Sequence, residues 1–236
     1  MLRNIAYSLI SRNFKVSKDW EEQLDRFFYQ THLVDLLNRL KINCVIDVGA
    51  NIGSYAQSMR KLGYKGYIFS FEPHPEIFVT LKRNLQPDSL CRAYDCALGS
   101  ENTSAIFNLN SYSELSSFLA PNPDMPKTVN SCEVNIRTLD SLLNEIIALV
   151  PEPRIFLKMD TQGYDMEVVK GANKCLDKIL CLQSEISVQP NYGNIPSYLD
   201  VLKYYQSLDF RLIDLFPAFR NPKGGVVEYD CLMVRD

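Results

Sequence analysis

The stretch VIDVGANIGSY, residues 45–55, contains residue types that suit the binding of a small ligand. An apolar run is interrupted by an acid, and two glycines then bracket an asparagine. Glycine allows tight turning and close backbone approach, and asparagine tolerates a left-handed conformation. Taken alone, such a pattern is more often a tight connection. We predict a ligand-binding turn formed by Asp47, Gly49, Ala50, Asn51 and Gly53.

A second acid, Glu72, ends the next apolar run in the segment FSFEPHP. It follows the glycines by about twenty residues, where nucleoside sites place an acid that accepts hydrogen bonds from both ribose hydroxyls. The alternative is that Glu72 caps the next helix, since Pro73 and Pro75 favour a helix start. The two signals together predict a nucleoside site with Glu72 and Pro73 at the ribose. The adenine is expected beside Asp95, Cys96, Ala97 and Leu98.

Two nucleoside cofactors compete for such a site, NAD and S-adenosylmethionine. A pyrophosphate prefers bare backbone N–H groups at a helix N-terminus, so an acid two residues before the first glycine repels it. The cationic amino group of S-adenosylmethionine is instead attracted by that acid, Asp47. The sequence therefore favours S-adenosylmethionine, and a nicotinamide-dependent reductase is the weaker alternative.

These residues depend on an alternation of strands and helices that begins at residue 44. Such alternation is typical of an α/β fold with a parallel sheet and helices on its faces, and no linker marks a second domain. The Ser-, Asn- and Pro-rich segment 108–126 is predicted to be a mobile loop over the site. Strands are predicted at 44–48, 67–71, 92–97, 132–139, 154–160 and 179–187, with a closing antiparallel hairpin at 210–216 and 226–236. Helices are predicted at 54–62, 76–85, 140–149, 162–172 and 197–207.

The composition suits one compact globular domain. The 236 residues are 46% hydrophobic and 22% charged, and no apolar run approaches the ~18 residues of a membrane-spanning helix. The N-terminus lacks a secretory signal pattern, so a cytoplasmic location is the default expectation. The seven cysteines form no C-x-x-C pair, two histidines are present, and the net charge is −3. These features argue against a disulfide framework, a zinc cluster and non-specific nucleic-acid binding.

Residues 1–40 are predicted to be an N-terminal helical extension of a domain at 41–236. Leu2, Ile5, Ala6 and Leu9 follow the spacing of an amphipathic helix, and a second helix is expected at about 20–40. The first helix is expected to pack on the domain or on a partner subunit, with contact to a membrane surface as the weaker alternative. The sequence thus leaves open a homodimer or a membrane-surface contact through this helix.

Five segments, in this order and spacing, resemble the FkbM family of S-adenosylmethionine-dependent methyltransferases: VIDVGANIGSYA, FSFEPHPEIF, VNIRTLDSL, LKMDTQGYDMEVVKGA and LQSEIS. The fourth segment distinguishes this family from class I methyltransferases at large, although Asp165 stands where members commonly carry Glu. The resemblance implies a Rossmann-like, seven-stranded, mostly parallel sheet whose last strand inserts antiparallel. It also implies O-methylation, with sugar hydroxyls of glycans and secondary metabolites as common acceptors. A lipophilic alcohol as acceptor, or a non-catalytic scaffold that keeps the fold, are the alternatives.

Methyl transfer to oxygen needs groups that align the acceptor and remove a proton from its hydroxyl. Asp160 ends the run FLKMD and Glu185 lies in LQSEIS, so both are expected at the carboxyl ends of neighbouring strands, facing one crevice. We predict Asp160 as the base and Glu185 as the anchor of a second hydroxyl. The alternatives are a helix N-cap for Asp160 and a surface ion pair for Glu185.

Two neighbouring residues complete the predicted site. Lys158 is expected to neutralise Asp160, with polarisation of an acceptor oxygen as the alternative. Residues 190–196 are expected at the rim of the acceptor site, where Tyr192 would stack on a sugar face. A dedicated magnesium or manganese site usually needs more than two firm oxygen ligands, and the sequence places no third carboxylate beside these two. No metal is therefore predicted.

Overall fold

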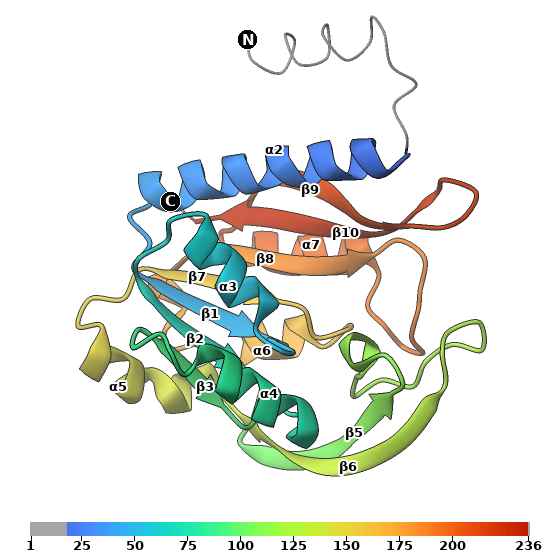
Figure 1. Ribbon diagram of the computed structural model, residues 1–236, viewed down its shortest axis with the longest axis horizontal. Coiled ribbons are helices and arrows are strands. Elements are labelled where there is room, and N and C mark those ends of the chain that lie inside the picture. Colours follow the sequence, from blue (N-terminus) through green and yellow to red (C-terminus); the bar gives the residue numbers. More distant parts are fainter. Residues whose placement is uncertain (1–17, 236) are drawn as a thin grey trace, which may run out of the picture.

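The computed structural model describes residues 18–235, so the amphipathic helix predicted near residues 2–10 lies outside the described part of the chain. The main strands are β1 (Cys44–Val48), β2 (Tyr67–Phe71), β3 (Cys91–Tyr94), β7 (Ile155–Met159), β8 (Ile179–Ser187), β9 (Arg211–Arg220) and β10 (Val226–Val234). They form a seven-stranded sheet in the order β3-β2-β1-β7-β8-β10-β9 (Figure 1). The strands from β3 to β8 are parallel, and β10 is antiparallel to both of its neighbours.

Helices cover both faces of this sheet (Figure 1). One face carries α2 (Lys18–Arg39), α3 (Ser54–Lys61) and α4 (Pro75–Leu85), and the other carries α5 (Leu139–Leu149), α6 (Asp165–Lys170) and α7 (Tyr198–Ser207). Successive strand side chains point to opposite faces, so Val45 packs with the first set of helices and Ile46 with the second. A central strand is therefore apolar along most of its length, so an apolar run such as IFLKM indicates a buried strand.

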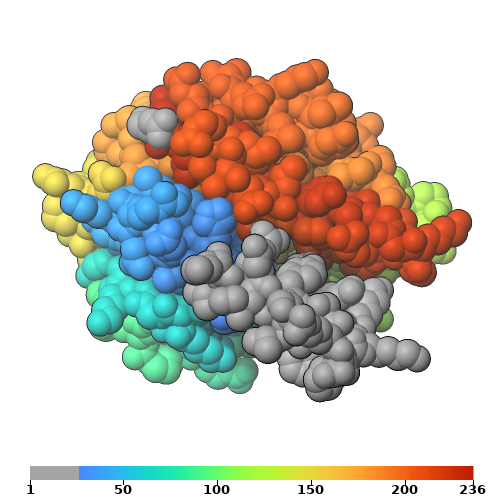
Figure 2. Space-filling view, turned by 90° about the horizontal axis from the view of Figure 1, so that it is seen from above, coloured from blue at the N-terminus to red at the C-terminus, as the bar shows by residue number. Residues whose placement is uncertain are grey.

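Helix α2 packs across the sheet through Leu33, Leu36 and Leu37, each of which is at most 4% exposed. Their spacing places them on one face of the helix. Figure 2 shows the described part of α2 between α3 and the segment that carries β9 and β10. The Tyr29 ring contacts Phe216 of β9, with 4.6 Å between centroids. Side chains of α2 thus belong to the core, and the domain boundary predicted at residue 40 stays a prediction.

A second, three-stranded sheet was not predicted. It contains β4 (Ala97–Leu98), β5 (Thr103–Asn110) and β6 (Thr128–Arg137) in the order β4-β6-β5. The strand predicted at 92–97 is wrong in extent, because β3 ends at Tyr94 and Ala97 begins β4. The loop predicted at 108–126 is wrong at its start, because Asn108 to Asn110 complete β5, and a 3-10 turn, η1 (Ser113–Leu115), follows. The Ser and Asn residues of β5 hid its alternation, in which Ile106 is exposed and Phe107 is buried.

The other predicted elements within residues 18–235 are confirmed to within a few residues, including the terminal hairpin, whose strands pair antiparallel. The predicted fold class is confirmed as well: an α/β fold with a mostly parallel seven-stranded sheet, one antiparallel strand and helices on both faces. Over residues 18–235, no helix combines the length and the hydropathy that crossing a membrane requires.

Candidate active site

The turn between β1 and α3 adopts the backbone conformations that its residue types permit. Gly49, Asn51 and Gly53 have φ values of 73°, 46° and 87°. A Cβ atom on Gly49 would lie 2.0 Å from the carbonyl oxygen of Asp160. The close approach that glycine allows here is therefore to the end of β7, and it places the turn directly beside Asp160.

Each backbone N–H of this turn already has an acceptor. The Asn51 N–H donates to Glu72 Oε2 at 2.8 Å, which joins the ends of β1 and β2. The other four donate to nearby oxygens: Gly49 and Ala50 to the Phe71 carbonyl, Ile52 to Asn51 Oδ1, and Gly53 to the Ala50 carbonyl. A pyrophosphate is held by free N–H groups at such a turn, so this arrangement disfavours a dinucleotide.

Glu72 lies at the end of β2 and is 6% exposed. Its two carboxylate oxygens accept from the backbone N–H groups of Asn51 and His74, each at 2.8 Å. Burial raises the pKa of Glu72 to about 7, although both hydrogen bonds favour the ionised form. Within the described part of the chain, His74 Nδ1 is buried without a hydrogen-bond partner. The end of β2 thus offers a ligand a carboxylate and an imidazole nitrogen, with the buried Pro73 between them.

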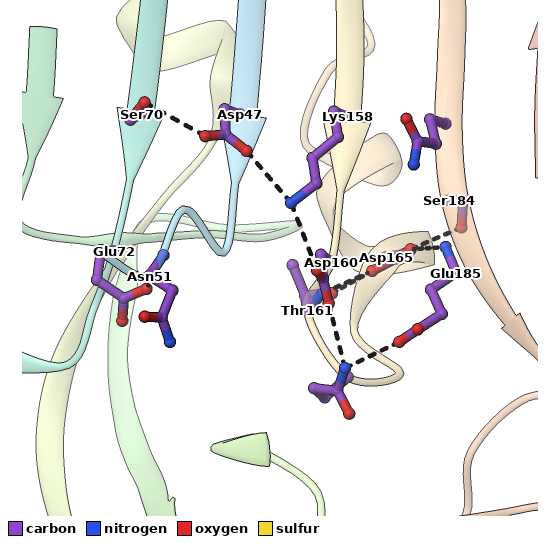
Figure 3. Close-up of polar contacts among 12 residues, drawn as sticks. Asp47, Asn51, Ser70, Glu72, Lys158, Asp160, Thr161, Asp165, Ser184 and Glu185 are labelled. Carbon is purple, nitrogen blue, oxygen red and sulfur yellow. Dashed lines mark hydrogen bonds and ion pairs between the residues drawn. The ribbon is translucent and has the colours of Figure 1, made fainter. Parts of the chain in front are cut away.

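Lys158 of β7 links Asp47, which lies within β1, to Asp160, which follows β7, as Figure 3 shows. Its Nζ atom lies 3.3 Å from Asp47 Oδ1 and 3.5 Å from Asp160 Oδ2. The Ser70 hydroxyl donates to Asp47 Oδ2 at 3.4 Å. Burial would lower the pKa of Lys158, but Asp47 and Asp160 together raise it above its usual range. Lys158 therefore remains charged and is shared by both acids.

This pairing changes the environment expected for Asp47. The side chain of Asp47 has no exposed surface, and Lys158 rather than open space lies beside its carboxylate. The direct contact predicted between Asp47 and the cofactor therefore stays a prediction. The neutralisation of Asp160 that the sequence suggested is shared with Asp47.

The structure brings Asp160 and Glu185 together through one amide group. Gln162 Nε2 donates to Asp160 Oδ1 at 3.1 Å and to Glu185 Oε2 at 2.8 Å. Gln162 Oε1 accepts from the Tyr192 hydroxyl at 2.9 Å. Burial raises the pKa of Glu185 well above its usual range, and nearby carboxylates, Asp160 first among them, add to this effect. No role was predicted for Gln162, which lies in the segment LKMDTQGYDMEVVKGA.

Asp165 holds the segment after β7 against β8. Its Oδ1 atom accepts from the Thr161 backbone N–H at 3.1 Å and from the Thr161 hydroxyl. Its Oδ2 atom accepts from the Ser184 hydroxyl at 2.6 Å and from the Glu185 backbone N–H at 3.2 Å (Figure 3). The aspartate that stands in place of the more common Glu is therefore buried and fully used within the protein.

Two further acids, which the sequence analysis did not single out, lie beside Glu185. Asp230 of β10 is the cross-strand partner of Glu185, and Glu228 precedes it by two residues, so all three point to the same face of the sheet. Burial raises the pKa of Asp230 to about 6 and also raises that of Glu228. The signal was present in the sequence, as acids at alternate positions of the apolar run VVEYDCLMV. In residues 18–235 no three His, Cys, Asp or Glu side chains are grouped to hold a metal ion.

Residues 111–119, here called the strap, contact the site at three points. At the β1 turn, Asn51 Nδ2 donates to Ser113 Oγ at 2.9 Å. After β8, the Tyr192 hydroxyl donates to the Leu115 carbonyl at 3.0 Å. After β7, the Ser117 hydroxyl donates to the Gln162 carbonyl at 2.9 Å. The single Tyr192 hydroxyl proton is thus shared between Leu115 and Gln162. Tyr192 is 2% exposed. The expectation that Tyr192 stacks on a sugar is therefore wrong, because its ring is packed in the interior.

The four residues expected to flank an adenine separate into two pairs. Asp95 and Cys96 line an open hollow of about 490 Å³ between the end of β3 and the second sheet. Ala97 and Leu98 are buried, form β4 and pair with β6. The structure thus leaves Asp95 beside the hollow, together with Cys96, which is itself only 4% exposed, whereas Ala97 and Leu98 support the second sheet.

Comparisons with known proteins agree with this geometry. Residues 47–212 match the family model of the methyltransferase FkbM domain. The chain is 27% identical over 198 residues to 2-O-methyltransferase NoeI of Sinorhizobium fredii (strain NBRC 101917 / NGR234), which covers 78% of this chain and 77% of that protein. It is 26% identical over 145 residues to Methyltransferase 1 of Beauveria bassiana (strain ARSEF 2860), a match that covers 54% of this chain and spans 57% of the fungal protein.

A solved structure supports the fold. The magnesium protoporphyrin IX methyltransferase ChlM from Synechocystis PCC 6803, solved with bound S-adenosylmethionine, superposes with a TM-score of 0.50 over 95% of this chain and 86% of that chain, at 9% identity. This likeness establishes a Rossmann-like methyltransferase fold. The family match covers most of the chain and includes the β1 turn, Asp160, Gln162 and Glu185, and it implies S-adenosylmethionine as the co-substrate. The chain therefore belongs to the FkbM methyltransferase family, as its sequence predicted.

Proposed function

We propose that the protein is an S-adenosylmethionine-dependent O-methyltransferase that methylates a hydroxyl of a sugar or a similar polyol. One observation carries this proposal: Asp160 and Glu185 are joined by a single amide directly beside the β1 turn. Such a pair suits an acceptor with several hydroxyls, because one carboxyl group takes the departing proton and the other holds a second hydroxyl. The related 2-O-methyltransferase supports oxygen as the acceptor atom.

The cofactor supplies a methyl group on a positively charged sulfur, and transfer to oxygen is an in-line displacement. The ends of β1, β2 and β3 fit this cofactor by the chemistry of their donors and acceptors. Glu72 would accept hydrogen bonds from the ribose hydroxyls, and the unpartnered His74 Nδ1 is available to the adenosine. Asp95 and Cys96 would lie beside the base. The β1 turn does not suit a pyrophosphate, because its backbone N–H groups already have acceptors within the protein.

Asp160 is the proposed base. Gln162 donates to its Oδ1 atom, and the Lys158 ammonium lies 3.5 Å from its Oδ2 atom. These two contacts hold the carboxylate in place beside the β1 turn. Glu185, whose pKa is raised well above its usual range by burial and by Asp160, would hold a second acceptor hydroxyl. The two roles follow from the two environments.

The lining of the site favours a polyol over a lipophilic alcohol. Asp160, Gln162 and Glu185 are joined to one another, and Asn191 donates to Glu228 Oε1 at 2.8 Å nearby. An apolar acceptor would cover these groups without pairing them, and an unpaired polar group costs about 1–3 kcal/mol. A non-catalytic scaffold would bind cofactor or acceptor without transferring a methyl group.

Incubation of the protein with labelled S-adenosylmethionine and a panel of sugars, polyols and lipophilic alcohols tests the proposal. We expect label in the sugar or polyol products. Asp160→Asn should lower turnover by a factor on the order of 100 or more while S-adenosylhomocysteine binding is retained, and Glu185→Gln should mainly raise KM. Asp177→Asn, at an exposed acid remote from the site, is the matched control. Cofactor binding without any product would support the scaffold, and full turnover of Asp160→Asn would place the base elsewhere.

The proposed reaction does not use a metal ion. A chelator should therefore leave turnover unchanged, since Asp160 and Lys158 provide the proton acceptor and the positive charge within the protein. The measurement is the turnover of dialysed protein with and without EDTA. Activity that is lost with EDTA and restored by magnesium would contradict this prediction.

A further inference from the structure

We infer that Gln162 is a positioning residue for methyl transfer: its side-chain amide holds Asp160 and Glu185 in one arrangement and keeps Asp160 ready to accept a proton. The inference rests on the proposed function. Gln162 is 8% exposed, and both ends of its amide are used within the site. It does not need to touch the acceptor, because it acts through the two carboxyl groups.

The chemistry of the partners determines the orientation of this amide. An ionised carboxylate accepts hydrogen bonds and donates none, so the nitrogen must face Asp160. The nitrogen carries two hydrogens, and the second points to Glu185 Oε2 at 2.8 Å. The amide oxygen then faces the Tyr192 hydroxyl at 2.9 Å. A glutamine therefore satisfies all three partners at once, and no other uncharged side chain of this length offers two donor hydrogens and an acceptor.

The backbone at Gln162 indicates that the position is selected for this side chain. Its φ is 52°, in the left-handed region that non-glycine residues seldom occupy, and the next residue, Gly163, has a φ of 95°. Such a conformation persists where the surroundings over-determine it, and it is concentrated at functional sites. Here the Ser117 hydroxyl holds the Gln162 carbonyl at 2.9 Å, so the strap secures the same residue from outside.

Loss of the amide should change the surroundings of the Asp160 carboxylate. Asp160 contacts the Gln162 amide and the Lys158 ammonium, and Gln162→Met would remove the first contact while keeping the length of the side chain. The carboxylate would then lose the hydrogen bond that links it to Glu185, and a hydrogen bond to a charged group is among the stronger ones.

Carboxyl ¹³C NMR of protein labelled at aspartate and glutamate detects this change at a single pH and without any acceptor, and Asp160→Asn identifies the Asp160 signal. We expect the Asp160 carboxyl signal to move in Gln162→Met, because the carboxylate loses its amide donor. Gln206→Met is the control, because Gln206 is an exposed glutamine on α7. It should leave the Asp160 signal unchanged.

A second variant guards against a failure to fold. Gln162→Asn suits the left-handed backbone better than glutamine does, but its shorter side chain cannot reach both carboxyl groups. It should move the Asp160 carboxyl signal as well. Once an acceptor is identified, both variants should lower kcat while S-adenosylhomocysteine binding is retained.

An Asp160 carboxyl signal that is unchanged in both variants would overturn the inference. A loss of kcat matched by an equal loss of S-adenosylhomocysteine binding would also overturn it, since a purely structural role predicts that result. A wild-type protein that transfers no methyl group would instead refute the proposed function, and the NMR comparison would still decide the role of Gln162.

Discussion

Lowering the pH from 8 to 6 should weaken S-adenosylhomocysteine binding about tenfold, because Glu72 must be ionised to accept both ribose hydroxyls. Burial raises the pKa of Glu72 from an ordinary 4.5 to about 7. If the ionised form alone binds, the competent fraction falls from roughly nine-tenths at pH 8 to roughly one-tenth at pH 6. An exposed glutamate would remain ionised over this whole range, and binding would not change.

Titration calorimetry at several pH values measures this effect. At pH 6 the free protein holds a proton on Glu72 that the ligand displaces, so binding should release a proton, which two buffers of different ionisation enthalpy detect. Glu72→Gln should bind weakly at pH 8 and show no dependence on pH. Asp230, whose pKa is about 6, titrates in the same window. Asp230→Asn is therefore the matched control and should keep the tenfold change.

Two outcomes would refute this reasoning. A wild-type affinity that is constant from pH 8 to 6 would mean that Glu72 does not hold the ribose or that it is ionised throughout. A pH dependence that disappears in Asp230→Asn and persists in Glu72→Gln would assign the titrating group to β10.

Three further predictions concern the framework of the site. Gly49→Ala should destabilise the protein by about 3 kcal/mol or more in denaturant unfolding, because the new Cβ would lie 2.0 Å from the Asp160 carbonyl oxygen and the backbone φ is positive. An unchanged midpoint of unfolding would contradict the geometry. Lys158→Met should cost about 3–5 kcal/mol by the same assay, since it leaves Asp47 buried without a cation. Adding Asp47→Asn should recover part of this loss, and a strictly additive double variant would argue against the pair. Asp165→Ala should cost about 2 kcal/mol or more, as its four donors lose their acceptor, whereas Asp177→Ala should be neutral.

The local sequence patterns were sufficient to predict most strands of the main sheet. Apolar runs such as CVIDV and IFLKM are buried on both faces, so their short length and the turn residues that flank them identify them as strands. The positive φ values at Gly49, Asn51 and Gly53 follow from residue types that tolerate them. The second sheet was missed because β5 is half exposed and rich in Ser and Asn, which local patterns assign to loops.

The sequence by itself determined which acids lie at or near the carboxyl ends of strands, because strand ends follow from local periodicity: Asp160 and Glu72 directly follow β7 and β2, and Glu185 lies near the end of β8. The tertiary structure alone decided which groups meet. Lys158 is shared by Asp47 and Asp160 because β7 lies beside β1, and Asp230 faces Glu185 because β10 inserts beside β8. Gln162 can link the two carboxyl groups because the adjacent strands β7 and β8 bring both within reach of one amide. Local patterns could not predict this link, since they carry no information on which distant segments pair.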